Sequence, residues 1–191
     1  MSVHTEPVTP DRWGDLETLF EEASATRNCW CMWWRIAGTA WRDTDKGSRK
    51  QSFSALVATG PPPGLLAYDK AMPIGWVQIT PRAVLPRFNA ARTAKPDTDA
   101  DLDAVWALSC FYIARSHRRT GVMARLAQDA CLWAARQGAH SVEAAALRPG
   151  KPLQWSDGYT GLSSALTRAG FETVEPRGTR RVLMRWHPRT A

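Results

Sequence analysis

The fold is decided by the stretch CFYIARSHRRTGVMARL, residues 110–126. Its first residues end the nearly unbroken apolar run VWALSCFYI (105–113), which predicts a strand covered on both faces. A short arginine-rich loop and Gly121 follow. A helix is then expected over 121–137, because apolar residues recur at helical spacing and Gly138 provides a stop. A buried strand, a glycine turn and a helix thus follow one another directly.

The turn before this helix has the features of an anion site. A helix N-terminus presents unpaired N–H groups and the positive end of the helix dipole. Gly121 allows a phosphate to approach the backbone closely, and Arg118 and Arg119 add positive charge. The pattern is neither G-x-G-x-x-G nor the G-K-[ST] of a P-loop, so a nucleotide-binding Rossmann or P-loop site has little support. The alternative is a solvated basic turn without a ligand.

The other segments predict further strands and helices around this unit. Helices are expected at about 10–23, 47–59 and 162–169. Strands are expected at about 3–8, 141–147, 171–175 and 180–186. LLAYD and MPIGWVQIT (65–80) predict a hairpin around Lys70 and Ala71, and the proline-rich, then acidic stretch 81–103 predicts a long loop. The expected fold class is α/β (α+β), a mixed sheet flanked by helices in one domain over residues 1–191.

The C-terminal stretch RRVLMRW alternates between apolar and basic residues. Val182, Met184 and Trp186 would share one face of a strand. Arg181 and Arg185 would share the other. This pattern predicts a half-buried strand with a solvated basic face.

The composition is that of a globular protein with an excess of positive charge. Apolar residues make up 44% of the chain, and no apolar run could span a membrane. The N-terminus shows no export signal, and the four cysteines are too few and too scattered for a disulfide framework, so a cytoplasmic protein with reduced thiols is expected. The net charge is +7, with 20 arginines against 5 lysines. Arginine-rich surfaces suit nucleic acid or a phosphorylated small ligand.

The segment Arg118-Arg119-Thr120-Gly121-Val122-Met123 resembles the [Q/R]-x-x-G-x-[G/A] motif of GNAT-superfamily N-acyltransferases. It lies between the central strand and the following helix, as it does in that family. The late Ala-Gly-Phe at 169–171, after a short helix, also matches, and the order of elements agrees over almost the whole chain. The resemblance implies a GNAT-like mixed, mostly antiparallel central sheet flanked by helices.

The resemblance also implies acetyl-CoA as the cofactor. The turn formed by residues 118–123 would bind its pyrophosphate through backbone N–H groups. Phe111, Tyr112 and Ile113, at the end of the preceding strand, would pair with the pantetheine arm. Ser164 is a further candidate contact. Met123 replaces the small residue that usually ends the motif, so its side chain is expected to point away from the pyrophosphate.

The chain departs from the family where the acid and the base of the reaction usually lie. Ala107 stands where many relatives carry a glutamate that removes the amine proton, and the central strand has no other acidic residue and no histidine. Proton removal would need an ordered water, or a residue such as Asp103 or Glu143, for which structural roles are expected. Leu166 stands where a tyrosine often protonates the leaving thiolate. Tyr159 is the nearest substitute for that catalytic acid.

The tryptophan-rich segment NCWCMWWRI (28–36) allows three interpretations. Its C-x-C spacing is not that of a structural zinc site, so no metal is expected. A role in the core is the second interpretation, but consecutive Trp33 and Trp34 cannot both face inward from one helix or strand face. The third follows from the family resemblance. Trp30, Trp33 and Trp34 would line the acceptor end of the cleft and bind an apolar or cationic group.

These features predict an N-acetyltransferase that moves an acetyl group from acetyl-CoA to a primary amine by direct attack. The acceptor would be a small molecule or a peptide. A non-catalytic acyl-CoA-binding protein is the first alternative, because the usual glutamate and tyrosine are absent. A nucleic-acid-binding module is the second, although no helix-turn-helix, zinc finger or RNP-like segment is present. Exposed tryptophans would suit a homodimer interface, and no membrane partner is expected.

Overall fold

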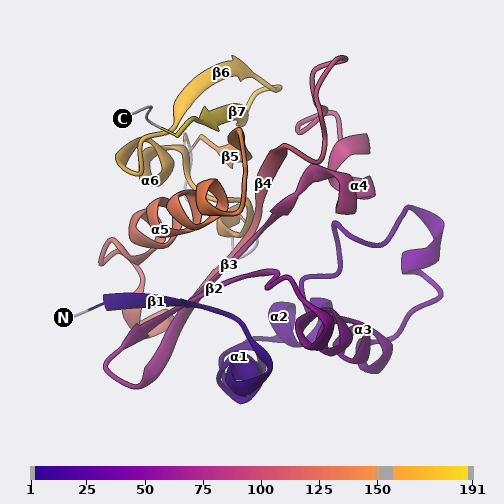
Figure 1. Ribbon diagram of the computed structural model, residues 1–191, viewed down its shortest axis with the longest axis vertical. Coiled ribbons are helices and arrows are strands. Elements are labelled where there is room, and N and C mark those ends of the chain that lie inside the picture. The colour runs from indigo at the N-terminus through magenta and orange to yellow at the C-terminus, as the bar shows by residue number, and fades with distance from the viewer. Residues whose placement is uncertain (1–2, 149, 151–156, 189–191) are drawn as a thin grey trace.

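A seven-stranded mixed sheet forms the centre of the computed structural model, which describes residues 3–148, 150 and 157–188 (Figure 1). The strands are β1 (Val3–Pro7), β2 (Gly64–Asp69), β3 (Met72–Pro81), β4 (Val105–Ile113), β5 (Ser141–Leu147), β6 (Glu172–Pro176) and β7 (Arg181–Trp186). The α-helices are α1 (Trp13–Glu21), α2 (Ser24–Cys29), α3 (Lys46–Thr59), α4 (Pro86–Ala90), α5 (Val122–Arg136) and α6 (Ser163–Arg168). The strand order is β1-β2-β3-β4-β5-β7-β6, and among these seven described strands only β4 and β5 pair in parallel. The predicted fold class is confirmed.

Helices cover both faces of the sheet, and each face has its own apolar cluster (Figure 1). On one face, α5 and α6 pack over a cluster that includes Leu108, Phe111 and Leu126. On the other face, α1 and α3 contribute Phe20 and Phe53 to a second cluster. None of the helices in the described part of the chain has the length and apolar content that a bilayer crossing requires.

Most elements lie where their residue pattern predicts them. β4 and β5 have the predicted bounds, and the hairpin of β2 and β3 turns at Lys70. α3 begins after Asp45, whose side chain accepts a hydrogen bond from the backbone N–H of Ser48. Two short helices were not predicted: α2, and α4 within the expected loop 81–103. α4 begins at Pro86, because proline is favoured in the first helical turn.

β4 contains an extra residue that changes which side chains face each side of the sheet. Its pairing with β3 passes over Ser109, which is therefore the added residue of a β-bulge. Leu108 and Phe111 consequently face the same side, under α5. Cys110 packs instead against the cluster under α1 and α3. The bulge therefore places a thiol and a freed carbonyl group on the face that carries the tryptophan-rich segment.

β4 and β5 diverge after a short stretch of parallel pairing. The pairing runs only from Val105 to Ala107 on β4, although this strand continues to Ile113. The segment 157–162 lies where the two strands separate, because the backbone N–H of Leu147 donates to the carbonyl oxygen of Gly161 at 2.8 Å. A 3₁₀ turn over Asp157–Thr160 therefore sits beside both strands.

The predicted solvated face of the last strand is wrong. Arg185 donates to one carboxylate oxygen of Glu143 from Nε at 2.8 Å and from Nη2 at 2.5 Å, and its side chain is only 25% exposed. Arg181 is half-buried and donates to the hydroxyl of Thr160. The physical reason is that other segments cover this face: Glu143 of β5 and Asp97 of the segment after β3 bind Arg185, and Thr160 of the 3₁₀ turn accepts from Arg181.

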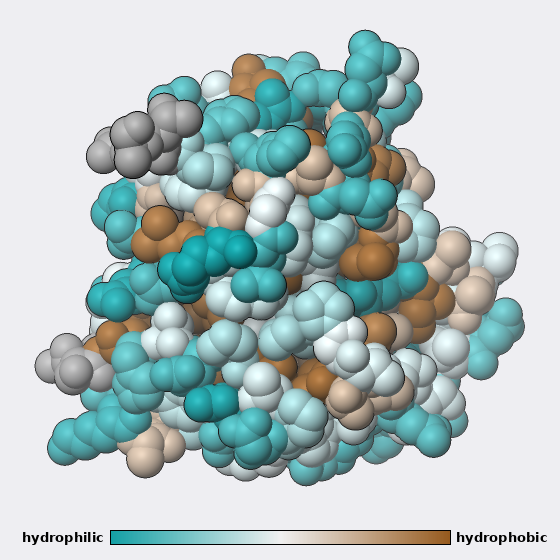
Figure 2. Space-filling model, viewed as in Figure 1, coloured by the Kyte–Doolittle hydropathy of each residue, from teal (hydrophilic) through white to brown (hydrophobic). Residues whose placement is uncertain are grey.

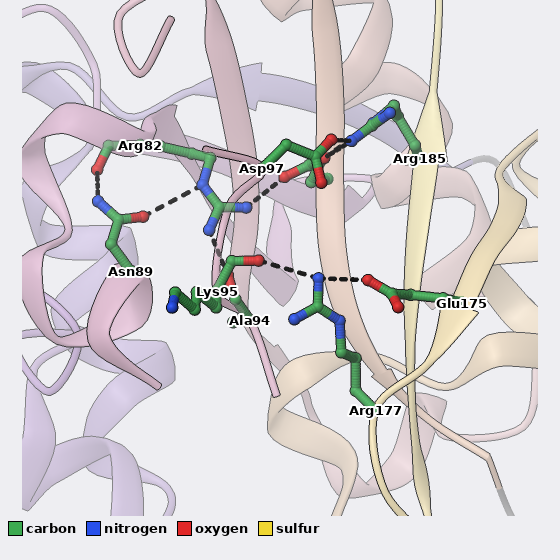
Figure 3. A network of polar contacts seen from close by, with 9 residues as sticks. Arg82, Asn89, Ala94, Lys95, Asp97, Glu175, Arg177 and Arg185 are labelled. Atoms are coloured by element: carbon green, nitrogen blue, oxygen red, sulfur yellow. Dashed lines mark hydrogen bonds and ion pairs between the residues drawn. The ribbon is translucent and has the colours of Figure 1, made fainter. Parts of the chain in front are cut away.

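A network of polar side chains connects the segment after β3 with β5 and β7 (Figure 3). Arg82 is fully buried, donates to Glu143, and reaches Oδ1 of Asn89 at 3.1 Å. Arg185 binds the other oxygen of Glu143 and also lies 2.7 Å from Oδ2 of Asp97. Pairing offsets the desolvation of these buried charges. The Glu143 carboxylate is therefore held by two guanidinium groups, which agrees with the expected structural role.

Candidate active site

The turn between β4 and α5 has the backbone geometry of an anion site. Gly121 immediately precedes α5 and has a φ of +91°, a conformation that favours glycine. The first amides of the helix have no partner within the helix. A Cβ atom added to Gly121 would meet no atom within 4 Å. The backbone here is thus open to a ligand that approaches closely.

Side chains of the same turn hold its shape. Nε of Arg118 donates to the carbonyl oxygen of Ile113 at 3.1 Å, at the end of β4. The hydroxyl of Thr120 donates to the carbonyl oxygen of His117 at 2.6 Å. His117 is itself buried, and its Nε2 lies 3.7 Å from a carboxylate oxygen of Asp69. The turn is therefore fixed before any ligand arrives.

A cavity of about 400 Å³, called here the first cavity, opens in front of this turn. Its lining includes eight of the predicted cofactor-binding residues, namely Phe111, Tyr112, Ile113, Arg118, Arg119, Gly121, Val122 and Met123. Thr120 and Ser164 are the two predicted residues outside this lining, and both are exposed. The thioether of Met123 accepts a hydrogen bond from the backbone N–H of Leu162 at 3.4 Å, so its side chain points toward the segment before α6.

A second cavity of about 650 Å³ lies against the tryptophan-rich segment. Much of its lining is aromatic or sulfur-containing: Cys29, Cys31, Trp33, Trp34, Trp41 and Cys110. Figure 2 shows apolar side chains gathered between α4 and the helices α2 and α3, on the side of the molecule where this segment runs. The second cavity is therefore suited to an apolar ligand.

The three tryptophans predicted to bind the acceptor have different surroundings. Trp30 is only 1% exposed and packs in the core, with its ring 5.5 Å from that of Phe20. Trp34 lines the second cavity, and its Nε1 donates to the carbonyl oxygen of Ser109 at 2.8 Å. Trp33 also lines this cavity and is 40% exposed. Both consecutive tryptophans reach the cavity because they lie in a turn, where helix and strand spacing do not apply.

Arginine side chains stack on the tryptophans of the second cavity. The guanidinium carbon of Arg49 lies 3.6 Å from the ring centroid of Trp41, and that of Arg87 lies 3.9 Å from the ring centroid of Trp33. Arg49 also donates to the backbone carbonyl oxygens of Asn28, Trp41 and Thr44. Trp41 is not among the predicted site residues, because it lies outside the tryptophan-rich segment 28–36. Its aromatic character was the only available signal.

Among the described residues, Tyr159 alone lines both cavities. It belongs to the 3₁₀ turn beside β4, and Asp157 in that turn pairs with Arg180 at 2.7 Å. Burial raises the pKa of the Tyr159 phenol above its ordinary value, so the hydroxyl stays protonated at neutral pH. A protonated hydroxyl between two cavities could give a proton to a group that bridges them.

The described lining of the second cavity has three thiols but no carboxylate and no imidazole. Burial raises the pKa of Cys29 to about 11 and that of Cys31 well above its usual value. The thiol of Cys31 also lies 3.1 Å from the indole nitrogen of Trp76. Ala107 is buried in a cluster with Phe88, and Asp103 is exposed outside the lining. No strong base therefore faces this cavity from the described residues.

The comparisons with known proteins identify the family. The sequence profile of the Acetyltransferase (GNAT) family matches residues 26–152. This range contains the tryptophan-rich segment, β4, the glycine turn and α5, and it covers more than half of the chain. The chain therefore belongs to the GNAT acetyltransferase family. A comparison with curated proteins found no match.

Solved structures share the fold over nearly the whole chain. A GCN5-related N-acetyltransferase from Kribbella flavida has a TM-score of 0.54 at 15% identity, with 97% of this chain and 98% of that chain covered. An N-acetyltransferase from Staphylococcus aureus Mu50 has a TM-score of 0.56 at 10% identity, with 98% and 99% covered. A PaiA N-acetyltransferase from Thermoplasma acidophilum, solved in complex with coenzyme A, has a TM-score of 0.50 at 15% identity, with 98% and 100% covered. These similarities confirm the GNAT-like sheet.

Proposed function

We propose that this chain transfers an acetyl group from acetyl-CoA to a primary amine by direct attack of the amine. The observation that carries the proposal is the position of Tyr159 between the two cavities. One cavity opens on the N-terminus of α5, and the other on the tryptophan-rich segment. Membership of an acetyltransferase family also supports acetyl transfer as the function. The acceptor would be a small molecule or a peptide.

The residues of the first cavity fit an acyl-CoA. The open backbone at Gly121 and the free amides of the first turn of α5 would hold the pyrophosphate, and Arg119 and Arg168 add positive charge at the cavity. The pairing of β4 with β5 ends at Ala107, so the backbone of β4 from Phe111 to Ile113 has no partner among the described strands on that side. This part of the backbone would pair with the pantetheine arm. Acetyl-CoA supplies a thioester whose acyl carbon accepts the amine and whose thiol is the leaving group.

The chain's own residues would act mainly by position. A backbone N–H of β4 near the bulge would polarise the acyl carbonyl. Tyr159, whose hydroxyl is protonated at neutral pH, would give its proton to the leaving sulfur. Bringing donor and acceptor together in adjacent cavities is the largest expected contribution. Free cysteines throughout the described chain support a reducing compartment, and we propose a cytoplasmic location.

Thermal unfolding with and without acetyl-CoA tests this function. A ligand at about 100 times its Kd stabilises the folded state by ~2.7 kcal/mol. For a chain of this size, that is a shift of roughly 5–10 °C. The expected result is a shift with acetyl-CoA and with free CoA, but not with ATP. No shift, in protein purified without bound CoA, would contradict the proposal.

The same preparation separates the two alternatives. A non-catalytic acyl-CoA-binding protein would show the thermal shift but release no CoA thiol with any amine. A nucleic-acid-binding module would bind DNA or RNA in a salt-dependent manner. That binding would survive the replacement of Gly121 by leucine.

A further inference from the structure

The described lining of the second cavity has no carboxylate that could pair with an ammonium ion, and arginines already stack on the rings of Trp33 and Trp41. Arg49 is the only charged side chain among its described lining residues. The residues outside 3–148, 150 and 157–188 carry no Asp, Glu or His side chain either. A buried ammonium without a carboxylate partner is costly. An acceptor that enters this cavity is therefore favoured if its amino group is uncharged.

The positive charge of the arginines that stack on the tryptophans also favours an acceptor with an uncharged amino group. Arg87 stacks on Trp33 at 3.9 Å and lies 5.7 Å from the ring of Trp41, on which Arg49 stacks at 3.6 Å. Arg87 donates hydrogen bonds to the backbone carbonyl oxygens of Ile36 and Gly38. Asp45, at the start of α3, offsets part of the charge of Arg49. Neither Arg49 nor Arg87, however, forms a direct ion pair with a carboxylate of the described residues. The two guanidinium groups would repel a cationic acceptor.

The titratable groups around the cavity offer no base for an ammonium proton. The thiols of Cys29 and Cys31 have raised pKa values, and Tyr159 is protonated at neutral pH. The remaining thiol is that of Cys110. The carboxylate of Glu22 lies 3.3 Å from the hydroxyl of Tyr112, but Glu22 is exposed, and Tyr112 lines the first cavity. Among the described lining residues of the second cavity, no carboxylate or imidazole is therefore placed to take a proton from a charged amine. Asp157, on the same 3₁₀ turn as Tyr159, lies outside this lining and pairs with Arg180.

The ionisation of the acceptor then decides which amines can react. An alkylamine resembles lysine, with a pKa of about 10.4, so at pH 7 only about one molecule in 2,500 has a free lone pair. In an aromatic amine the lone pair is delocalised into the ring. Such an amine is neutral at pH 7 and needs no base before attack. Its flat apolar body also suits a cavity walled by Trp33, Trp34 and Trp41.

We propose that the acceptor is an aromatic amine whose amino group is uncharged at pH 7. This inference rests on the proposed acetyl transfer. In the reaction the nitrogen–carbon bond forms, the carbon–sulfur bond breaks, and one proton passes from nitrogen to sulfur. No net proton is released. Tyr159 could serve both ends of this exchange, giving its proton to sulfur and regaining one from nitrogen. A charged amine would have to release one further proton, to a base that the described cavity lacks.

A matched pair of probes tests the proposal by binding. 1-Aminonaphthalene and 1-(aminomethyl)naphthalene share the same ring, but only the second is cationic at pH 7. Calorimetric titration into the protein saturated with CoA gives a Kd for each. The aromatic amine is expected to bind at least about tenfold more tightly. Equal binding, or tighter binding of the aminomethyl compound, would overturn the proposal.

Kinetics with acetyl-CoA provide a second readout. Between pH 6 and 9, kcat/KM for the aromatic amine is expected to stay nearly constant, whereas the value for the aminomethyl compound should rise about tenfold per pH unit. Faster turnover of the aminomethyl compound or of a polyamine at pH 7 would overturn the inference alone. The absence of a thermal shift with acetyl-CoA would overturn the proposed function, and the inference with it.

Arg87→Gln tests the contribution of the positive charge, and Arg136→Gln is the matched control at the exposed end of α5. The first variant should narrow the binding preference for the aromatic amine several-fold, and the second should leave it unchanged. If Arg87→Gln lowers the melting temperature strongly, a second measurement takes its place. The ratio of the two Kd values is then measured in the unmodified protein at several salt concentrations, because salt screens such charges. A preference insensitive to both the variant and salt would contradict the charge argument.

Discussion

The indole nitrogen of Trp34 donates a hydrogen bond to the carbonyl oxygen of Ser109 at 2.8 Å. This contact joins the tryptophan-rich segment to the β-bulge of the central strand. The ring of Trp34 also lies 5.3 Å from that of Phe88 in α4. One side chain therefore positions the wall of the second cavity relative to the strand that we propose for pantetheine binding.

Trp34→Phe should cost more stability than the matched variant Trp33→Phe. Phenylalanine keeps most of the apolar surface but cannot donate to the carbonyl group of Ser109. An unsatisfied buried acceptor costs about 1–3 kcal/mol. Trp33 makes no such bond among the described contacts, so its variant should lose less. Urea unfolding measures both values, and equal losses would contradict the assigned role of the bond. The affinity for acetyl-CoA should be unchanged in both variants.

The sequence was sufficient to predict the elements whose residue pattern is local. β4 is a continuous apolar run, and α5 combines an apolar stripe with flanking glycines at 121 and 138. The turn between them is also predictable from the sequence, because the position of Gly121 before a helix indicates a residue with positive φ. Hydrophobic period and glycine conformation act within a few residues, so no tertiary information was needed.

The remaining features depend on contacts between distant residues. The bulge at Ser109 is defined by the register with β3, which the sequence of β4 alone does not contain. The sequence groups Trp30 with Trp33 and Trp34, whereas the structure places Trp30 in the core, with positive φ angles at Trp30 and Cys31. Alternation in β7 predicts a solvated Arg185, because it does not show that Glu143 and Asp97 from other segments cover that face. Each of these differences concerns tertiary placement and not the type of element.

Gly121→Leu should abolish binding of acetyl-CoA, and Gly138→Leu offers a matched control. The two glycines flank the same helix, have φ angles of +91° and +93°, and have no atom within 4 Å of an added Cβ. Both variants should therefore lose about the same stability, roughly 1–2 kcal/mol from the left-handed conformation. Only the first places a side chain where the phosphate would approach.

Calorimetry with acetyl-CoA and urea unfolding should be performed on both glycine variants. Gly138→Leu is expected to keep the affinity of the unmodified protein. Retained affinity in a folded Gly121→Leu variant would show that the cofactor lies elsewhere. A similar loss of affinity in both variants would point to a general effect on α5.

Tyr159→Phe should lower kcat by about 10²-fold or more, because the leaving sulfur loses its proton donor. Burial raises the pKa of this phenol, so the acid form persists beyond the ordinary tyrosine value of about 10, and activity should not decline through Tyr159 ionisation below that pH. Tyr68→Phe is the control, since its hydroxyl contacts Asp15 outside both cavities. The affinity for CoA should be retained. Unchanged kcat in Tyr159→Phe would remove the assigned acid.

Glu143→Gln should destabilise the protein without changing the pH dependence of kcat/KM. The carboxylate is shared by fully buried Arg82 and by Arg185, so its loss leaves a buried guanidinium without its ion-pair partner (Figure 3). Removing one partner of a buried pair costs about 3–5 kcal/mol. Glu175→Gln is the control, because the side chain of Glu175 is 49% exposed where it pairs with Arg177. That change should cost less than about 1 kcal/mol.

The double variant Arg82→Met/Glu143→Met separates pairing from burial. Replacing both charges by apolar side chains removes the buried guanidinium of Arg82, and Arg185 keeps its contact with Asp97, so part of the stability lost in Glu143→Gln should return. Urea unfolding of Arg82→Met, Glu143→Met and the double variant gives the coupling energy. If Glu143→Gln were as stable as the control variant, the structural role of Glu143 would be wrong. If it also abolished the rise of kcat/KM with pH for an alkylamine, Glu143 would act as a base. The acceptor would then regain a route for losing its proton, and charged amines would become the first substrates to examine.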